Sequence, residues 1–80
     1  NMSVPREPDH YHPTVHAVDR AKSRGIDWDI VSKTIQGGEI KKSHKDGCRL
    51  FVKDYQHTDN PVGVVANIES GEILTVQWRR

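Results

Sequence analysis

One short segment of the chain carries a histidine and two arginines at helical spacing. His16, Arg20 and Arg24 follow one another at intervals of four residues, so an α-helix would place them along one side. An imidazole can exchange a proton near neutral pH, and a guanidinium can hold a phosphate through paired hydrogen bonds. This combination predicts a surface that binds a phosphodiester and moves a proton on it. In the alternative interpretation, the three side chains are solvated on a surface helix, where Asp19 partly neutralises the arginines.

Two further histidines could take part in such proton transfers. Metal-free RNA cleavage requires a base for the 2′-hydroxyl proton, an acid for the leaving oxygen and cations for the developing charge. His44 lies near a predicted turn and His57 in a predicted loop, so either is also explained as an ordinary exposed histidine. His16 is preferred because a helix fixes the direction of its side chain.

A strand predicted around Arg49 alternates basic and aromatic residues. Arg49, Phe51, Lys53 and Tyr55 share one face, on which rings could stack bases while cations hold phosphates. Arg49 is preferred to Lys53 as a catalytic cation because a guanidinium binds phosphate at two points. Lys42 is expected to assist phosphate binding. The alternative is that Phe51 faces the helices and completes the core.

Two helices are expected to position the first of these groups. The first should run between Thr14, a favoured N-cap, and Gly25, which suits the left-handed position after a helix. The second should begin after Asp27 and end at Gly37 and Gly38. The apolar stripe of the first helix is predicted to comprise Val15, Val18, Ala21 and the methylenes of Lys22. That of the second comprises Ile26, Ile30, Val31 and Ile35.

After the second helix the apolar residues alternate, which is typical of strands. Extended segments are expected at residues 39–45, 48–55, 62–68 and 72–78, with turns at Asp46–Gly47 and Ser70–Gly71. The predicted fold is α+β, with two N-terminal helices packed on a three- to four-stranded antiparallel sheet. Residues 39–45 and the last strand could both form sheet edges, so a homodimer through an edge is left open.

The composition limits the size of the core and the types of site. With 80 residues, 34% of them hydrophobic, the chain cannot combine a deep substrate cavity with a complete core, so any active site should be a surface cleft. No apolar run approaches the roughly 20 residues that cross a bilayer, so we expect no membrane contact and a cytoplasmic location. The single cysteine, Cys48, cannot form an internal disulfide or a Cys-x-x-Cys metal site.

Charge is clustered although the net charge is only +1. A protein with this balance is neither favoured nor excluded as a nucleic-acid binder, so the distribution matters more than the total. The basic clusters are Arg20, Lys22 and Arg24; Lys41, Lys42 and Lys45; and Arg79 with Arg80.

Residues 1–13 are expected to form a flexible arm that packs little, ahead of a single α+β domain at residues 14–80. Three prolines lie among polar residues in this arm. His10, His12 and His16 have a spacing that can gather imidazoles on a metal. However, Pro13 separates the first two from the helix, and no acidic or cysteine ligand cluster completes the set. We therefore expect no metal and no cofactor.

Several short motifs together resemble a known family. They are His16-x-x-x-Arg20-x-x-x-Arg24-Gly25-Ile26, the Gly-Gly-Glu-Ile at the end of the second helix, Arg49-Leu-Phe-Val, Val62-Gly-Val-Val and Leu74-Thr-Val-Gln-Trp78. Nearly the whole chain after residue 13 resembles a small family of uncharacterised bacterial and archaeal domains, similar in plan to RelE-like and barnase-like ribonuclease toxins.

This resemblance implies a metal-independent endoribonuclease, the toxin of a toxin–antitoxin pair, whose open sheet face receives RNA. By analogy His16 is the general acid/base and Thr75 is a hydrogen-bond partner. The expected catalytic residues are therefore His16, Arg20, Arg49 and Thr75, and the expected RNA-binding residues are Arg24, Lys42, Lys53, Phe51 and Tyr55. The expected partners are RNA and a cognate antitoxin. The alternative is a non-catalytic module that uses the same basic face to bind nucleic acid or protein.

Overall fold

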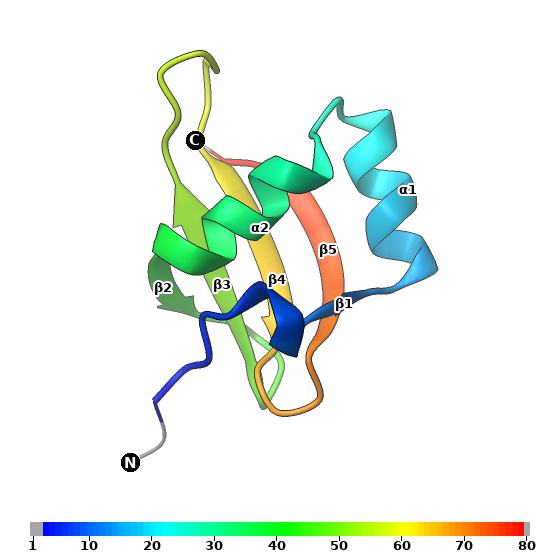
Figure 1. The fold of residues 1–80 in the computed structure, drawn as a ribbon, viewed down its shortest axis with the longest axis vertical. Coiled ribbons are helices and arrows are strands. Elements are labelled where there is room, and N and C mark those ends of the chain that lie inside the picture. The colour runs from blue at the N-terminus through cyan, green and yellow to red at the C-terminus, as the bar shows by residue number, and fades with distance from the viewer. Residues whose placement is uncertain (1–2, 80) are drawn as a thin grey trace.

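The computed structural model describes residues 3–79; Asn1, Met2 and Arg80 lie outside the described residues, including the second half of the Arg79–Arg80 cluster. The fold has two layers: the two helices form one, and the sheet forms the other (Figure 1). In chain order the elements are a 3₁₀ turn η1 (Pro8–His10), β1 (His12–Pro13), α1 (Val15–Ser23), α2 (Trp28–Gly37), β2 (Glu39–Lys42), β3 (Cys48–Lys53), β4 (Val62–Asn67) and β5 (Glu72–Trp78).

The sheet has five strands in the order β1-β5-β4-β3-β2. Strands β2 to β5 are antiparallel neighbours, whereas β1 pairs parallel with the start of β5. The α+β class with two helices is therefore confirmed, but the expectation of three or four strands, all antiparallel, was wrong. Strand β1 is only two residues long and includes Pro13, so it shows no alternating pattern in the sequence.

Both helices pack on one face of the sheet, α2 across β3 and β4, and α1 along β5 (Figure 1). The core between the two layers is centred on Val31, Ile35, Phe51, Val64 and Val76, which are at most 1% exposed. No helix of the described chain covers the other side of the sheet. We call this side the open face; it is formed by alternate residues of the strands, among them Lys41, Leu50, Gly63, Val65 and Thr75.

The ends of α1 confirm the capping signals. The Thr14 hydroxyl accepts a hydrogen bond from the Ala17 amide (3.2 Å), and Gly25 has a φ of +68°. The Ile26 amide donates to the Ala21 carbonyl (2.9 Å), which closes the last turn. The apolar stripe, however, is rotated from the prediction: Ala17 and Ala21 are buried, whereas Val15 is 80% exposed.

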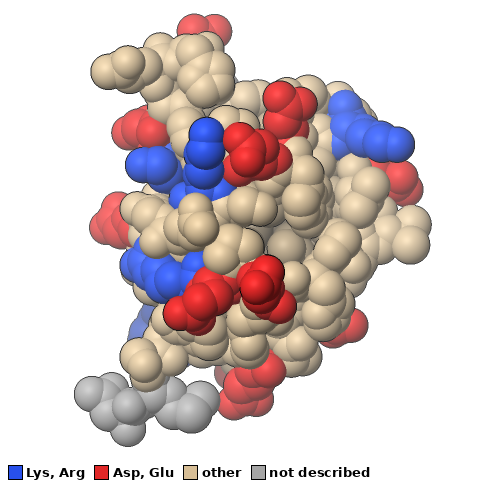
Figure 2. Space-filling view, viewed as in Figure 1, with Lys and Arg blue, Asp and Glu red and all other residues tan. Residues whose placement is uncertain are grey.

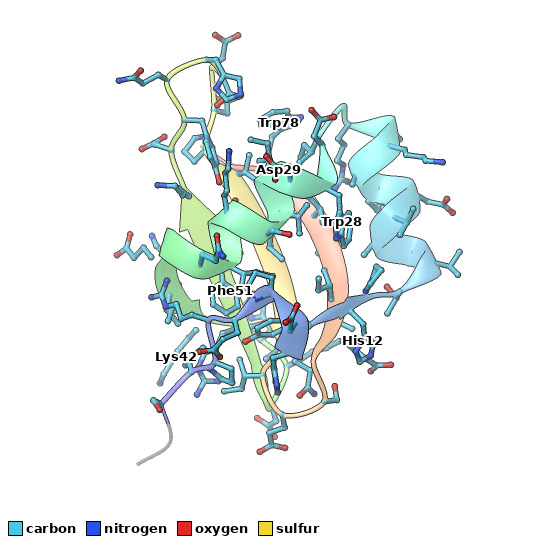
Figure 3. All side chains as sticks on the ribbon, in the orientation of Figure 1. His12, Trp28, Asp29, Lys42, Phe51 and Trp78 are labelled. Atoms are coloured by element: carbon cyan, nitrogen blue, oxygen red, sulfur yellow. The ribbon has the colours of Figure 1, made fainter. Side chains whose placement is uncertain are left out.

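Strand β3 alternates as predicted, but its two faces are exchanged. Phe51 is 0% exposed and lies beneath α2 (Figure 3), edge-on to Tyr11 with ring centroids 5.9 Å apart. The expectation that this ring stacks on RNA bases was therefore wrong. The face of Cys48, Leu50 and Val52 is the more apolar in the sequence, so the periodicity favoured it as the side toward the helices, whereas the large aromatic ring of Phe51 fills the space under α2.

The N-terminal segment packs on the domain, contrary to the expectation that it packs little. Tyr11 is 7% exposed and belongs to the core, and its hydroxyl donates to the Pro5 carbonyl (2.7 Å). Arg6 donates to three carbonyls at the end of α2, the shortest bond being 2.7 Å to Gly38. A cation at the C-terminus of a helix satisfies free carbonyls and the helix dipole.

Tyr11 is expected to make the free energy of unfolding decrease at alkaline pH. Burial raises the pKa of its phenol above the ordinary 10.0, against a lowering effect of Arg6 and with a smaller raising effect of Glu7. Because the folded protein keeps this proton at pH values where the unfolded chain loses it, the free energy of unfolding falls as the pH rises past about 10. We expect the urea midpoint to drop above that pH in the wild type and to drop less in Tyr11→Phe, with urea titrations across the alkaline range as the measurement. If the urea midpoint fell equally steeply with pH in the wild type and in Tyr11→Phe, this expectation would be contradicted.

The two predicted sheet edges differ. Strand β2 is an edge of the sheet, so a homodimer through residues 39–42 stays a prediction. The edge of strand β5 is partly covered: β1 pairs with its first residues, and nearer its end the Arg24 guanidinium donates to the Val76 carbonyl (2.6 Å).

None of the helices in residues 3–79 combines the length and apolar character needed to span a bilayer.

Candidate active site

A cleft of about 560 Å³ lies where the open face meets the start of α1. Four separate parts of the chain line it: the beginning of α1, the loop between β2 and β3, strand β4 and strand β5. Its lining residues are Thr14, His16, Ser43, His44, Lys45, Val65, Leu74 and Thr75. The fold thus brings His16 and Thr75, both predicted site residues, together with His44, which the sequence offered only as an alternative proton carrier.

His16 is held at the cleft by the first turn of α1. Thr14 anchors this turn to the sheet, because its hydroxyl donates to the Ile73 carbonyl of β5 (2.8 Å) while accepting from the Ala17 amide. The exposed imidazole Nε2 accepts a hydrogen bond from Arg20 Nε (3.3 Å), as the spacing of four residues predicts. The imidazole that lines the cleft therefore has a guanidinium beside it.

An irregularity in β5 turns Thr75 into the cleft. Val65 pairs with Thr75, but Ala66 pairs with Ile73, so Leu74 is an extra residue in the ladder. Such a β-bulge re-aims the side chains on either side of it. Ile73 and Val76 can therefore both be buried in the core, while Leu74 and Thr75 line the cleft.

The loop between β2 and β3 forms the opposite wall. Gly47 has a φ of +79°, and its carbonyl accepts from the Ile68 amide (2.9 Å), which ties the loop to the end of β4. His44 and Lys45 are exposed on this loop and line the cleft. The sequence carried a signal for both residues, a free histidine next to a basic cluster, but gave no indication of which strand ends they would approach.

Most of the predicted phosphate-binding residues lie elsewhere. Arg49 and Lys53 share the helix-covered face with Phe51, and Arg49 donates to the neighbouring Cys48 carbonyl (2.9 Å). Tyr55 packs against the core, and its hydroxyl bonds to Thr34 (2.7 Å) under α2. Lys42 lies at the β2 edge, with β3 and β4 between it and β5 (Figure 3). The structure does not bring these four residues to the cleft.

Arg24 is occupied in another way. Its guanidinium bonds to the Val76 carbonyl, and its own carbonyl accepts from Trp78 Nε1 (2.9 Å). This residue joins α1 to β5, so its visible role is to position the helix that carries His16.

The helix-covered side lacks a continuous basic surface. Figure 2 shows lysines and arginines there interleaved with aspartates and glutamates. The one ion pair within the described residues, Lys33–Asp29 (3.2 Å), is on this side, on α2. Mixed charge of this kind does not attract a polyanion strongly.

Two further hollows within the described residues contain no pair of histidines and no histidine beside a lysine or arginine. One of about 540 Å³ lies between α1 and α2 and is mainly apolar, and it contains no histidine; Val18, Lys22 and Trp28 help to line it. The other, of about 370 Å³, is formed by the loop around His57 together with Trp78. In the N-terminal segment, His10 Nε2 bonds to the Ile68 carbonyl (2.7 Å), and no group of three His, Cys, Asp or Glu in residues 3–79 is arranged to hold a metal.

Comparison with known proteins identifies the family. No curated protein matches the chain, and no solved structure matches it. A family model described as a domain of unknown function, DUF4258, matches residues 14–78, which include both helices, strands β2 to β5 and every residue of the cleft. The chain therefore belongs to the DUF4258 family.

Proposed function

We propose that this protein is a metal-independent endoribonuclease that cleaves single-stranded RNA in the cleft at the start of α1. One observation carries the proposal: His16 and His44, from segments far apart in the sequence, line a single cleft together with Thr75 and Lys45. A second cation, Arg20, is hydrogen-bonded to His16. Two imidazoles, a hydroxyl and two cations are the groups that phosphodiester cleavage without a metal requires.

The reaction is a transesterification within the RNA chain. One histidine removes the proton from a 2′-hydroxyl, and the resulting oxygen attacks the adjacent phosphorus. The bond from phosphorus to the 5′-oxygen of the next nucleotide breaks, and the other histidine donates a proton to that oxygen. The products are a 2′,3′-cyclic phosphate and a free 5′-hydroxyl. Arg20 and Lys45 stabilise the negative charge that develops on the phosphoryl oxygens, and the Thr75 hydroxyl donates a hydrogen bond to one of them.

The biological role follows the resemblance to ribonuclease toxins. We propose that the protein acts as a toxin that is held inactive by a cognate antitoxin. Expression of the wild type should then arrest growth, expression of His16→Ala should not, and co-expression of the partner should relieve the arrest.

The test of the enzymatic proposal is cleavage of a mixed-sequence single-stranded RNA in EDTA. We expect the wild type to cut and to leave 2′,3′-cyclic phosphate ends, and His16→Ala to lose the activity while still binding the RNA. His57→Ala is the matched control, because it also removes a histidine but lies outside the cleft. Its activity should equal that of the wild type.

Two results would contradict the proposal. One is that folded wild type retains RNA in a salt-dependent manner but cuts none, which would favour the non-catalytic binding module. The other is that cutting persists unchanged in His16→Ala, which would place the chemistry elsewhere.

A further inference from the structure

A glycine near the start of β4 provides the space for an arginine on the open face. A Cβ atom at Gly63 would lie 2.7 Å from Cγ and 3.0 Å from Cδ of Arg79, and 3.3 Å from Cδ1 of Leu50. Glycine inside a strand often marks a site of close approach. The aliphatic stem of Arg79 therefore lies flat on the sheet at Gly63, where a larger residue would displace it.

The backbone also fixes this arginine in place. The Arg79 amide donates to the Pro61 carbonyl (2.7 Å), which holds the end of β5 against the start of β4. Arg79 itself is exposed and makes no ion pair within 4.0 Å in the described chain. A guanidinium that is positioned by its stem and has no acidic partner is available to an external anion.

Arg79 and the proposed active site occupy the same side of the sheet. Gly63 and Val65 are two residues apart on β4 and point to the same face, about 7 Å apart along the strand. Val65 lines the cleft and pairs with Thr75. One nucleic-acid strand lying across the open face can therefore contact both the cleft and Arg79.

The nearby charges are of both signs. Lys41 belongs to the row Lys41–Leu50–Val65–Thr75, whereas Glu39 ends the row that crosses Gly63. Glu39 is two strands from Gly63, about 10 Å, which is close to the screening length at 0.1 M salt. Its carboxylate should therefore weaken anion binding at Arg79 slightly, and removing this charge should strengthen it.

We propose that the open face from the cleft to Arg79 is the path of a single RNA strand, and that Arg79 binds a phosphate flanking the one that is cleaved. This inference rests on the proposed ribonuclease function and adds a binding subsite to it. The partly exposed side chain of Val65 lies along the same path, where a base or ribose can contact it.

Binding of an uncleavable RNA tests this path. The probe is a fluorescent 2′-O-methyl oligouridine, which cannot form a cyclic phosphate, titrated with wild-type full chain at several salt concentrations. We expect Arg79→Gln to weaken binding on the order of tenfold at low salt and to reduce the slope of log K against log salt by about 0.7, the value for one contact to a single strand. Glu39→Gln should strengthen binding.

Two variants separate position from net charge. Gly63→Ala keeps the charge but displaces the arginine stem, so it should weaken binding in the same direction as Arg79→Gln. Lys33→Gln removes the same charge from α2 on the opposite side and should leave binding unchanged. Equal losses in Lys33→Gln and Arg79→Gln, or wild-type binding by Gly63→Ala, would overturn the proposal.

The outcome is independent of the cleavage assay. If neither RNA cleavage nor RNA binding depended on Arg79, the proposed path would be refuted and the ribonuclease proposal would stand. Arg79-dependent binding without cutting would support the path and refute the nuclease. A wild type that does not bind the probe would overturn the path.

Discussion

His44→Ala will lower the rate of RNA cleavage about 10²- to 10⁴-fold, the range in which a single general acid or base contributes. The reason is the placement of His44 on the wall of the cleft that also contains His16 and Thr75. His44 is exposed on a loop, so the substitution removes no core contact and the free energy of unfolding should stay the same. Single-turnover rates with saturating enzyme give the effect on the chemical step.

A double variant shows whether the two histidines act in one reaction. If one removes the 2′-hydroxyl proton while the other protonates the leaving oxygen, His16→Ala/His44→Ala should be no more than about tenfold slower than the slower single variant, because groups that act as a unit are not additive. Losses that multiply would indicate independent roles, and an active His44→Ala would assign the second proton transfer to another group. Thermal unfolding of all three variants excludes misfolding as the cause.

The helical half of the fold could be read from local chemistry. The Thr14 cap, the Gly25 terminus and the four-residue spacing of His16 and Arg20 depend on neighbours within one or two turns, and the structure shows each of them. Local signals do not determine which side of a short helix meets the sheet. For this reason the stripe through Val15 was predicted wrongly, while the small residues Ala17 and Ala21 allow α1 to approach β5 closely.

The sheet was harder to predict, because the orientation of its strands depends on contacts between residues far apart in the sequence. Alternation in β3 is visible in the sequence, but the orientation of its two faces is set by what covers them, namely α2 and Tyr11 on one side and Arg79 on the other. The bulge at Leu74 shifts the pattern of β5 by one residue without any glycine or proline to mark it. An N-terminal segment rich in proline looked unstructured, yet Tyr11 and Arg6 fix it to the core and to α2.

The same distinction explains the candidate site. His16, Arg20 and Thr75 were predicted as site residues from helical spacing and from a family resemblance, and the structure places His16 and Thr75 in one cleft. His44 and Lys45 reach the cleft only because the β2–β3 loop approaches the open face. Arg79 is positioned by Gly63 of the neighbouring strand β4, a long-range contact that the local sequence does not indicate. Arg49, Lys53 and Tyr55 were selected because they alternate with Phe51, so the wrong orientation of one strand displaced all three.

Phe51→Ala will destabilise the protein by about 3–5 kcal/mol, as is usual for removal of a buried aromatic ring. The ring is 0% exposed, contacts Tyr11 edge-on and lies in the core cluster with Ile35 and Val64. At roughly 0.05–0.15 kcal/mol per residue, the 80-residue chain has a total stability of about 4–12 kcal/mol, so this loss is a large fraction of it. Urea unfolding followed by tryptophan fluorescence measures the change.

Phe51→Leu distinguishes a core role from a base-stacking role. Leucine fills much of the same volume, so its cost should be nearer 1–1.5 kcal/mol, roughly the range of tolerated hydrophobic exchanges, and the protein stays folded. A buried residue makes no contact with RNA, so this variant should bind the 2′-O-methyl oligouridine as the wild type does. A folded Phe51→Leu that binds the RNA much more weakly would instead show that the ring reaches the nucleic acid, and that the helix-covered face opens to receive it.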